Sequence, residues 1–519
     1  MNDQRPEIPV LTGDMQREVD RSAITSGLPS SVLMESAGRA AAAWLLEELQ
    51  PRSAVILAGR GGNGGDALVV ARCLAEEGVP IKVFLLHPRS EMSTDAAEMA
   101  DRLAGVAPES IRPLDLPSED LDRALRRTGW IVDGLFGSGL TRPLDRRHAA
   151  LVTRIETSAR PIASLDLPSG LPSDTGEVIG PTVHADVTIA MEFLKPAHLL
   201  FPARSACGRI AVARVAYPPE ILAAVRPVAN VLTASGVRRR LPNRLPAGHK
   251  GTFGRVVIVA GSLGMSGAAI LCARGALRVG AGLVTVACPT AINDILETAV
   301  PEAITLPLPD EGGRLTAAAL DPLIEAIAPA DAVAVGPGLS RHPEVQAVIR
   351  RLLPHVSTPL VLDADGLVAF TDHREALGKR PSPLVLTPHP GELGRLIDTP
   401  PETIDAGRIE IAQRFAGDHG VTLLLKGRPT VLTTPGAAPL LNPTGNTGLA
   451  TGGSGDVLTG MIVGLLAGGA APADAAAAGA YLHGAAADRL ATTIAERAIT
   501  PSDLLAALPE TIAEVERCS

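Results

Sequence analysis

The sequence predicts an α/β protein built from two domains, each a parallel sheet between two layers of helices. Short β-branched segments alternate with apolar patterns of helical period, which is typical of parallel sheets covered on both faces. Glycine-rich loops precede a helical pattern at two distant places, residues 59–66 and 449–460. The length of 519 residues exceeds what one hydrophobic core usually serves. We therefore expect two domains, each with its own site.

In the first half, a helix and strand order can be assigned from local patterns. Thr12 is placed to cap a helix that carries Met15, Val19 and Ala23, and a second helix is expected over residues 31–49. The β-branched runs predict strands at 54–58, 81–86, 130–133, 161–165, 186–190 and 209–213.

The second half repeats this alternation without repeating the residue pattern. Strands are expected at 255–260, 283–287, 332–335, 359–363, 383–386 and 421–425, and Ala-rich helices follow from residue 456. The proline-rich stretch 217–246 stops both helices and strands. We expect domains at 1–217 and 229–519, with residues 218–228 as a linker. The basic run 238–240 is interpreted as a solvated helix end.

The composition argues against several classes of function. The chain has 46% hydrophobic and 20% charged residues, and its net charge of −9 argues against a nucleic-acid-binding surface. Five scattered cysteines without metal spacing suit a reducing compartment. The apolar stretch 461–482 is interrupted by Pro472 and Asp474, so buried helices explain it better than a membrane span. No leader pattern opens the chain. We expect a cytoplasmic homo-oligomer that binds neither nucleic acid nor membrane.

The loop 449–460 combines four closely spaced glycines with one acid, Asp456. Glycines let backbone N–H groups converge, and the following helix adds its positive end, so the loop suits phosphate oxygens. An aspartate beside a phosphate is unfavourable unless it takes up a proton or binds a cation. Asp456 is therefore a candidate general base for a hydroxyl that attacks a phosphoryl group. The alternative is that Asp456 only caps the helix.

In the first half, acids are expected just past the carboxyl ends of strands, where chemistry in α/β sheets is usual. Asp133 and Asp166 each end a predicted strand, and glycine-containing loops follow both. The alternative is that both acids only cap turns. Asn63, Asp133 and Ser169 offer hard oxygen ligands, which suit an alkali or alkaline-earth cation rather than zinc.

Ordered motifs carry a resemblance over nearly the whole chain. Four motifs resemble those of NAD(P)H-hydrate epimerases, at residues 34–38, 61–66, 133–139 and 166–170. Further motifs resemble those of ADP/ATP-dependent NAD(P)H-hydrate dehydratases, at 250–254, 336–338, 386–392, 425–427, 442–446 and 455–456. The sequence thus resembles the family of bifunctional NAD(P)H-hydrate repair enzymes. This implies a Rossmann-like first domain and a ribokinase-like second domain.

The resemblance implies two reactions on hydrated NADH and NADPH, called NADHX and NADPHX, which carry a hydroxyl at ring carbon C6. The first domain would interconvert the R and S epimers, and the second would dehydrate the S epimer with ADP or ATP and Mg²⁺. Asp456 would take the hydroxyl proton, the nucleotide would donate a phosphoryl group, and the ring nitrogen would expel phosphate. ADP is favoured, although both nucleotides fit the loop.

The resemblance also assigns site residues. In the first domain the hydrate is placed on Gly62, Asn63, Gly64, Gly65, Asp66, Gly137, Ser138, Gly139, Leu140, Thr141, Arg142, Pro143 and Asp166. Potassium is placed on Asn63, Asp133 and Ser169. In the second domain the hydrate is placed on Ala268, Gly338, His389 and Asp456, and the nucleotide on Lys426, Gly427, Arg428, Pro429, Thr430 and Gly455.

Asp166 is then the candidate acid or base for ring opening and reclosure at C6. Lys195 is a weaker candidate, because a snorkelling surface lysine is the simpler interpretation. The first loop departs from the family pattern: Gly62 replaces an asparagine, Arg60 a proline and Ala67 a glycine. A side-chain hydrogen bond to the hydrate is therefore missing at Gly62. The rival interpretations are a ribokinase-like small-molecule kinase, which leaves the first half unexplained, and a non-enzymatic nucleotide sensor.

Overall fold

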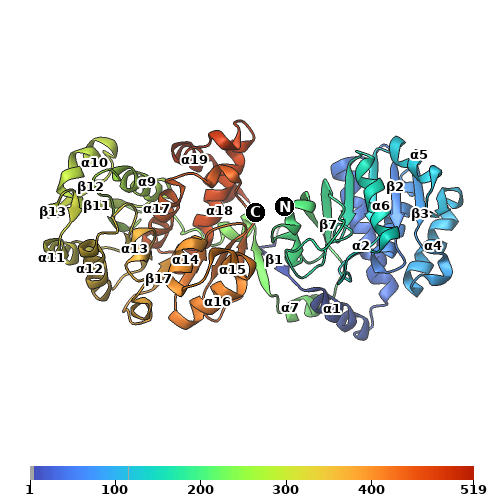
Figure 1. Ribbon diagram of the computed structural model, residues 1–519, viewed down its shortest axis with the longest axis horizontal. Coiled ribbons are helices and arrows are strands. Elements are labelled where there is room, and N and C mark those ends of the chain that lie inside the picture. The colour runs from blue at the N-terminus through green and yellow to red at the C-terminus, as the bar shows by residue number, and fades with distance from the viewer. Residues whose placement is uncertain (1–4, 115, 519) are drawn as a thin grey trace. The chain divides into compact units, whose positions relative to one another are not determined.

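The computed structural model describes residues 5–114 and 116–518. The chain divides into two compact units, residues 8–228 and 229–518, and residues 5–7 group with the second (Figure 1). Strand β1 (Glu7–Val10) opens the described chain. The segment expected to be a linker contains helix α7 (Pro219–Ala224), which belongs to the first unit.

The first unit contains a seven-stranded parallel sheet in the order β4-β3-β2-β5-β6-β7-β8. Its strands are β2 (Ala54–Ala58), β3 (Ile81–Leu85), β4 (Ile111–Pro113), β5 (Trp130–Gly134), β6 (Ile162–Leu165), β7 (Val187–Met191) and β8 (Arg209–Ala213). The expected strands are confirmed, and only the three-residue β4 was missed. The strand order reverses between β2 and β5, which opens a crevice at the carboxyl edge there.

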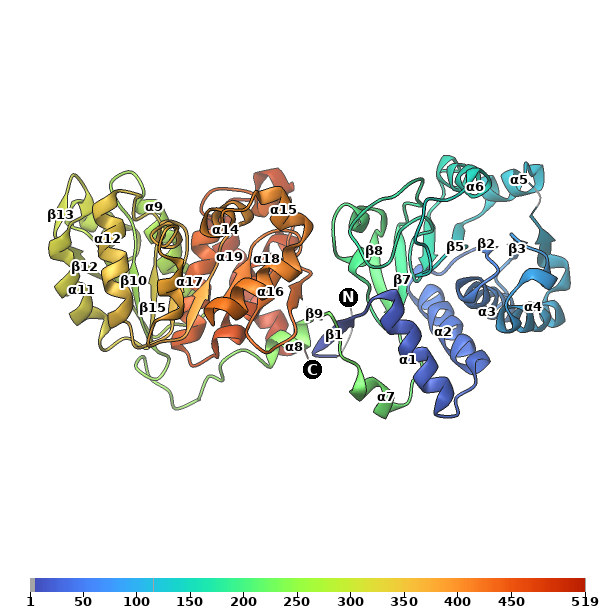
Figure 2. The same ribbon diagram turned by 60° about the horizontal axis from the view of Figure 1, so that its bottom comes forward.

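Helices cover both faces of this sheet. One face packs against α1 (Gly13–Thr25), α2 (Ser30–Trp44), α3 (Gly62–Glu76) and α4 (Thr94–Val106), and the other against α5 (Glu119–Arg127) and α6 (Arg146–Thr157) (Figure 2). Thr12 caps α1 as expected, because its hydroxyl accepts from Met15 N at 3.2 Å. The second expected helix, 31–49, is helical over its whole length, but only α2 (Ser30–Trp44) is α-helical, and Leu45–Leu49 form a π-helical turn.

In the second unit the strands follow the order β9-β20-β19-β18-β17-β16-β15-β10-β11-β12. Their bounds are β9 (Ala229–Leu232), β10 (Arg255–Val259), β11 (Leu283–Pro289), β12 (Ile304–Leu308), β15 (Ala332–Val335), β16 (Leu360–Leu362), β17 (Leu384–Leu386), β18 (Thr422–Leu425), β19 (Thr430–Thr433) and β20 (Leu440–Asn442). Neighbours are parallel except that β19 is antiparallel to both β18 and β20. The six strands expected here are confirmed, and β9, β12, β19 and β20 were missed. A separate hairpin joins β13 (Asp310–Glu311) to β14 (Arg314–Leu315).

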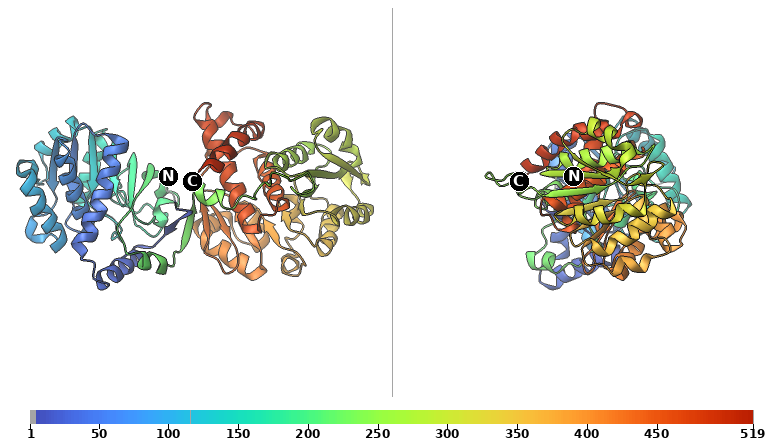
Figure 3. Two further views of the ribbon diagram at one scale, coloured as in Figure 1. Left: turned by 180° about the vertical axis from the view of Figure 1, so that it is seen from behind. Right: turned by 90° about the vertical axis from the view of Figure 1, so that its left-hand side faces the viewer.

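The helices of the second unit are α8 (Ala234–Arg238), α9 (Ser266–Arg278), α10 (Asn293–Ala299), α11 (Leu320–Ile327), α12 (Pro343–Leu352), α13 (Asp365–Val368), α14 (Pro390–Ile397), α15 (Pro401–Ala406), α16 (Arg408–His419), α17 (Ser454–Ala467), α18 (Pro472–Ala491) and α19 (Pro501–Arg517). Helices α9, α17, α18 and α19 share one buried cluster with a face of the sheet, and the last three are red in Figure 3. Small residues permit this packing: a Cβ on Gly460 would lie 1.9 Å from the Cys272 carbonyl oxygen.

The apolar stretch 461–482 lies in α17 and α18, which are mostly buried, as expected. Within the described part of the chain, no helix has the length and apolar character needed to cross a membrane. The basic run 238–240 does lie at the end of α8, but Arg240 is not simply solvated. Its guanidinium pairs with Glu7 and lies 3.2 Å from Asp474. That part of the prediction was wrong, because the partner residues are distant in the sequence.

Candidate active sites

The first site lies at the carboxyl edge of the first sheet, at the loops that follow β2 and β5. The loop after β2 leads directly into α3, which begins with Gly62 and Asn63. Only glycine fits at position 64, because a Cβ on Gly64 would lie 1.9 Å from the Gly59 carbonyl oxygen. Asn63 Nδ2 donates to the carbonyl oxygen of Phe136, beyond β5, at 2.9 Å. The two loops therefore meet at the reversal of the strand order.

The three residues predicted to hold potassium meet at this end of β5. Asp133 is fully buried, and its carboxylate accepts from Ser164 Oγ and Ser169 N at 2.9 Å and from Ser169 Oγ at 2.6 Å. Burial raises the pKa of Asp133, and these hydrogen bonds oppose the shift. Ser169 Oγ also accepts from Phe136 N at 3.0 Å. Asn63 Oδ1 is buried and has no hydrogen-bond partner among the described residues.

Asp166 follows β6 in a strained turn. Its φ of +60° is left-handed, and Leu167 N donates to the Leu165 carbonyl oxygen at 2.7 Å, which closes a γ-turn around it. His198 Nδ1 accepts from Lys195 N at 3.0 Å, so its other nitrogen, Nε2, carries the proton and donates to the Asp166 carbonyl oxygen at 2.7 Å. Burial lowers the pKa of His198 to about 4. A neutral imidazole therefore orients the turn that presents Asp166.

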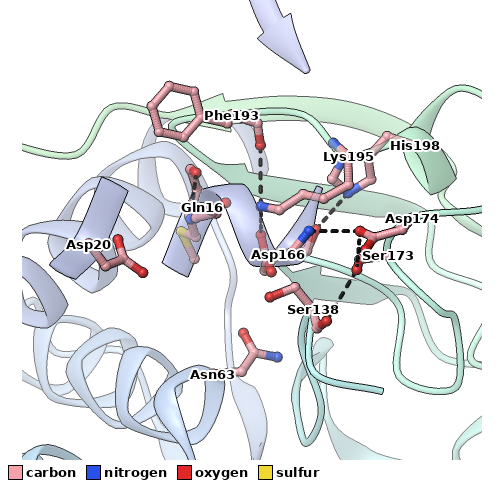
Figure 4. Close-up of polar contacts among 12 residues, drawn as sticks. Gln16, Asp20, Asn63, Ser138, Asp166, Ser173, Asp174, Phe193, Lys195 and His198 are labelled. Atoms are coloured by element: carbon pink, nitrogen blue, oxygen red, sulfur yellow. Dashed lines mark hydrogen bonds and ion pairs between the residues drawn. The ribbon is translucent and has the colours of Figure 1, made fainter. Parts of the chain in front are cut away.

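The prediction that Lys195 is a surface lysine was wrong. Its side chain is 0% exposed, and its ammonium pairs with Asp166 Oδ1 and donates to the Phe193 carbonyl oxygen at 3.3 Å (Figure 4). A buried ammonium is stable only with such partners. The flanking Phe193, Leu194 and Pro196, all buried, were the available signal for burial.

The Asp166 side chain lines a cavity of about 1120 Å³. Most of the predicted hydrate-binding residues of the first unit line it as well: Gly62, Asn63, Gly64, Asp66, Gly137, Ser138, Gly139, Leu140, Thr141, Arg142 and Pro143. Gly65 does not; a Cβ there would lie 2.3 Å from Met34 Sδ, so this glycine allows α3 to pack closely. The cavity is large enough for a ligand of dinucleotide size.

Further polar residues of this cavity were missed from the sequence, among them Gln16, Asp20 and Tyr217. Gln16 and Asp20 come from α1, and Tyr217 follows β8. The Tyr217 hydroxyl donates to Asp20 Oδ1. Burial raises the pKa of Asp20, and burial together with nearby Asp166 raises the pKa of Asp66 well above its usual range. The helical pattern of α1 identified only its apolar positions, so it gave no signal for the polar face.

The second site lies at the carboxyl ends of β10, β15, β16, β17 and β18. Asp363 follows β16 and is 1% exposed. Its Oδ1 accepts from Lys426 Nζ at 3.0 Å, and its Oδ2 accepts from Thr459 Oγ1 of α17 at 2.7 Å. Lys426 Nζ also lies 3.7 Å from Glu392 Oε2. Burial opposes protonation of Lys426, but the two carboxylates outweigh it and raise its pKa.

Asp456 lies in the first turn of α17 and is not its N-cap. The N-cap is Gly453, with a left-handed φ of +93°, so the capping alternative was wrong. Burial raises the pKa of Asp456 to about 7; nearby Asp363 adds to the shift and Lys426 opposes it. A Cβ on Gly455 would lie 3.5 Å from Lys426 Nζ, which places this glycine beside the ammonium. The arrangement joins a carboxyl that titrates near neutrality to a cation and a helix N-terminus.

Two other predicted hydrate-binding residues are in contact. Gly338 has a left-handed φ of +63°, and a Cβ there would lie 3.0 Å from Ala268 Cβ. Ser262 Oγ donates to the Gly338 carbonyl oxygen at 2.8 Å. At the start of the same loop, a Cβ on Gly336 would lie 1.8 Å from the Asp363 carbonyl oxygen. The loop after β15 therefore packs against the backbone of Asp363, whose side chain pairs with Lys426.

His389 caps helix α14. Its Nδ1 accepts from Gly391 N at 3.0 Å, and its own N–H donates to Glu392 Oε2 at 2.9 Å. Burial lowers the pKa of His389. The side chain remains 50% exposed, with Nε2 3.5 Å from Glu392 Oε1. His389 therefore has a structural role at the start of α14, and its contact with the hydrate stays a prediction.

The predicted nucleotide loop, Lys426–Thr430, connects β18 to β19 around a buried arginine. Arg408 is 3% exposed and donates to the Pro429 carbonyl oxygen at 2.7 Å and to the Lys426 carbonyl oxygen at 3.1 Å. A Cβ on Gly427 would lie 2.3 Å from Arg408 Nη2, so glycine is required there. Arg408 was missed, because nothing near it in the sequence identifies the loop it supports.

Asp363 and Glu392 were missed for a different reason. Asp363 is the last residue of the strand expected at 359–363, and position at a strand end is the same signal that identified Asp133 and Asp166. Glu392 lies in the motif at 386–392, but the resemblance implied no role for it. Within residues 5–114 and 116–518, no cluster of three or more His, Cys, Asp or Glu side chains is arranged to hold a metal ion.

Family models match most of the chain. The model described as YjeF-related protein N-terminus matches residues 30–197, and the model described as NAD(P)H-hydrate dehydratase matches residues 256–510. The bifunctional NAD(P)H-hydrate repair enzyme Nnr of Moorella thermoacetica is 40% identical over 98% of this chain and 97% of its own length. The enzyme of the same name from Salinibacter ruber is also 40% identical, over 98% and 96%.

A solved structure is similar to the second unit. The ADP/ATP-dependent NAD(P)H-hydrate dehydratase of Bacillus subtilis, co-crystallised with ATP and Mg²⁺, is 33% identical and covers 55% of this chain and 98% of that chain, with a TM-score of 0.47.

One parallel and one mostly parallel sheet, each with acids and glycine loops at its carboxyl edge, define a two-site α/β enzyme. The chain belongs to the family of bifunctional NAD(P)H-hydrate repair enzymes. This membership accounts for both halves, whereas the small-molecule kinase alternative leaves the first half without a role.

Proposed function

We propose that the first unit epimerises the C6 hydrates of NADH and NADPH and that the second unit dehydrates the S epimer with ADP or ATP. Family membership over the whole length supports both activities. The observation that carries the dehydratase assignment is the position of Asp456, whose carboxyl has a pKa of about 7 and lies beside Lys426 at the start of α17. A base with that pKa is suited to activate a hydroxyl at neutral pH.

In the proposed dehydration, Asp456 takes the proton of the C6 hydroxyl as that oxygen attacks the terminal phosphoryl group. Lys426 and the first turn of α17 stabilise the charge on the transferring group. The ring nitrogen lone pair then expels phosphate and restores the dihydronicotinamide. We assign the nucleotide to Lys426–Thr430 and Gly455, and the hydrate to Ala268, Gly338 and His389 beside Asp456.

Mg²⁺ fits the donor set around Lys426. Asp363 Oδ1 and Glu392 Oε2 are carboxylate oxygens that both face the same ammonium, at 3.0 and 3.7 Å. These two residues would hold the ion, because Mg²⁺ prefers a few carboxylates together with phosphate oxygens and water. The ion would neutralise phosphate charge.

Potassium fits the end of β5. Asn63 Oδ1 is a buried acceptor without a partner among the described residues, and the oxygens of Asp133 and Ser169 form the hydrogen-bonded cluster beside it. Such neutral and anionic oxygens suit an alkali cation. The ion would supply positive charge to the loop after β5, while Asp166 exchanges a proton with the hydrate.

The test is conversion of racemic NADPHX by the full-length protein with Mg²⁺, K⁺ and either nucleotide. Recovery of the reduced-nicotinamide absorbance should reach completion, because the R epimer is converted to the S epimer as the latter is consumed. Asp166→Asn should stop near half conversion. Replacing K⁺ with choline should slow only the second half of the conversion, in which the R epimer must first be epimerised. A stable phosphorylated product, or no recovery with either nucleotide, would rule out the proposal.

Dehydration should lose activity as the pH falls below about 7. Asp456 acts as a base, so only its deprotonated form is active, and burial raises its pKa to about 7. Asp363 is the largest charge that raises this pKa, so Asp363→Asn should move the rising limb of kcat/KM to lower pH, while the loss of a proposed Mg²⁺ ligand lowers the plateau of the profile. The measurement is kcat/KM for the S hydrate across the neutral range. A wild-type profile that is flat through pH 7 would contradict the role of Asp456.

A further inference from the structure

The N-terminal helix α1 presents two different faces to the first unit. Val19 and Ala23 pack with the buried apolar residues of that unit. Gln16 and Asp20, one helical turn apart, line the 1120 Å³ cavity instead. Residues 16 and 20 precede the stretch that the first family model matches, which begins at residue 30.

The polar face of α1 is held in place by contacts of Gln16 and Asp20 with other elements. Gln16 Nε2 approaches the Met191 carbonyl oxygen at 3.5 Å, and Gln16 Oε1 is buried without a partner among the described residues. The Tyr217 hydroxyl donates to Asp20 Oδ1, which orients the carboxyl and leaves its second oxygen available. Tyr217 is itself buried, 7% exposed, and its ring packs 5.8 Å from that of Phe193.

Asp20 and Asp166 reach the cavity from different elements. In Figure 4 the Asp20 carboxyl, on α1, points toward the side where Asp166 lies beside Lys195. Lys195 is committed to Asp166 by a direct ion pair. Asp20 therefore shares the cavity with a carboxylate that already has a cation, and burial raises the pKa of Asp20. Neighbouring carboxyls with such different environments are suited to opposite roles as base and acid.

We propose that Asp20, oriented by Tyr217, is the second proton carrier of the epimerase, the group that exchanges a proton with the ring nitrogen. This inference rests on the proposed epimerase function. In ring opening, the Asp166 carboxylate takes the C6 hydroxyl proton, C6 becomes a carbonyl, and the C6–N1 bond breaks with its electrons on N1. The Asp20 carboxyl gives its proton to N1. After rotation about C5–C6, N1 attacks the other face, and both protons return.

The first test is Asp20→Asn in the full-length protein. An amide cannot supply the proton, so the rate of R to S interconversion should fall by about 100-fold or more. Asp20→Glu should recover part of the rate. Asp14→Asn is the matched control, because Asp14 lies on the same helix with a side chain that is 88% exposed and should leave the rate unchanged. Dehydration of purified S hydrate, measured in the same samples, should stay at the wild-type rate in all variants.

The second test is the pH profile of Tyr217→Phe, which a purely structural role would not move. The charged and titratable groups that act on Asp20 are Tyr217, Lys195, Asp166, Arg17 and Asp66. The Tyr217 hydrogen bond lowers the pKa of Asp20, so its loss raises that pKa. Because the acid must be protonated, the falling limb of epimerase kcat/KM should move to higher pH by about 0.5 to 1 unit.

Each result decides between the alternatives. A wild-type rate and an unchanged limb in Asp20→Asn would overturn the assignment while leaving the epimerase function intact. If the falling limb of epimerase kcat/KM is lost in Asp66→Asn but kept in Asp20→Asn, the acid is Asp66. That result would also overturn the assignment of Asp20. Absence of epimerisation in the wild-type protein would instead refute the proposed function.

Discussion

Replacing Asp456 with asparagine should reduce dehydration of the S hydrate by roughly 1000-fold. Asparagine keeps the size and shape of the side chain but cannot take up the hydroxyl proton. Nucleotide binding should remain, because the contacts proposed for the phosphates come from Lys426 and the first turn of α17. The measurements are the initial rate of absorbance recovery on purified S hydrate and the affinity for an unreactive nucleotide analogue.

The matched control for Asp456→Asn is Asp474→Asn. Asp474 also lies in the first turn of a helix, α18, but it is half exposed and interacts with Arg240. Its substitution should leave dehydration at the wild-type rate. The epimerase rate should be unchanged in both variants. Retention of more than about a tenth of the dehydration rate by Asp456→Asn would show that another group, or water, is the base.

Replacing Lys195 with methionine should destabilise the first unit by about 3–5 kcal/mol and abolish epimerisation. The Asp166 carboxylate would remain largely buried, with its side chain only 11% exposed, after losing its cation. Both tryptophans of the chain, Trp44 and Trp130, lie in the first unit, so their fluorescence reports the unfolding of this unit alone. Urea titration followed by tryptophan fluorescence is the measurement.

The double variant Asp166→Asn/Lys195→Met supplies the control for this prediction. It removes both charges, so most of the lost stability should return although epimerisation should not. Dehydration of the S hydrate in the same samples should stay at the wild-type rate, since Lys195 belongs to the other unit. If the double variant is as unstable as Lys195→Met, the loss comes from packing of the lysine stem and not from the unpaired carboxylate.

Most of the fold was predictable because its signals are local. β-branched segments identified every strand of the first sheet except the three-residue β4, and the glycines at 64 and 336 lie at close backbone approaches. The missed strands β9, β19 and β20 lie where the second sheet departs from the simple alternation of strand and helix. The π-helical turn after Trp44 has no signal in an apolar helical pattern.

The candidate sites were predictable only in part. Position after a strand identified Asp133 and Asp166, and the same rule applied to the second half would have found Asp363. Asp20 could not be found in this way, because its partner Tyr217 is 197 residues away. Arg408 is similar, since it supports a loop that begins 18 residues later.

The sequence by itself determined the two α/β units, the glycine loops and the acids beside them, because periodicity, turn chemistry and position at a strand end depend on neighbouring residues. Only the tertiary structure decided the ion pairing and the pKa values of those acids. The partnership of Asp166 with buried Lys195, and the pKa of about 7 at Asp456, arise when distant charges are brought together out of water. Burial and Coulomb energy depend on three-dimensional distance, which no local pattern contains.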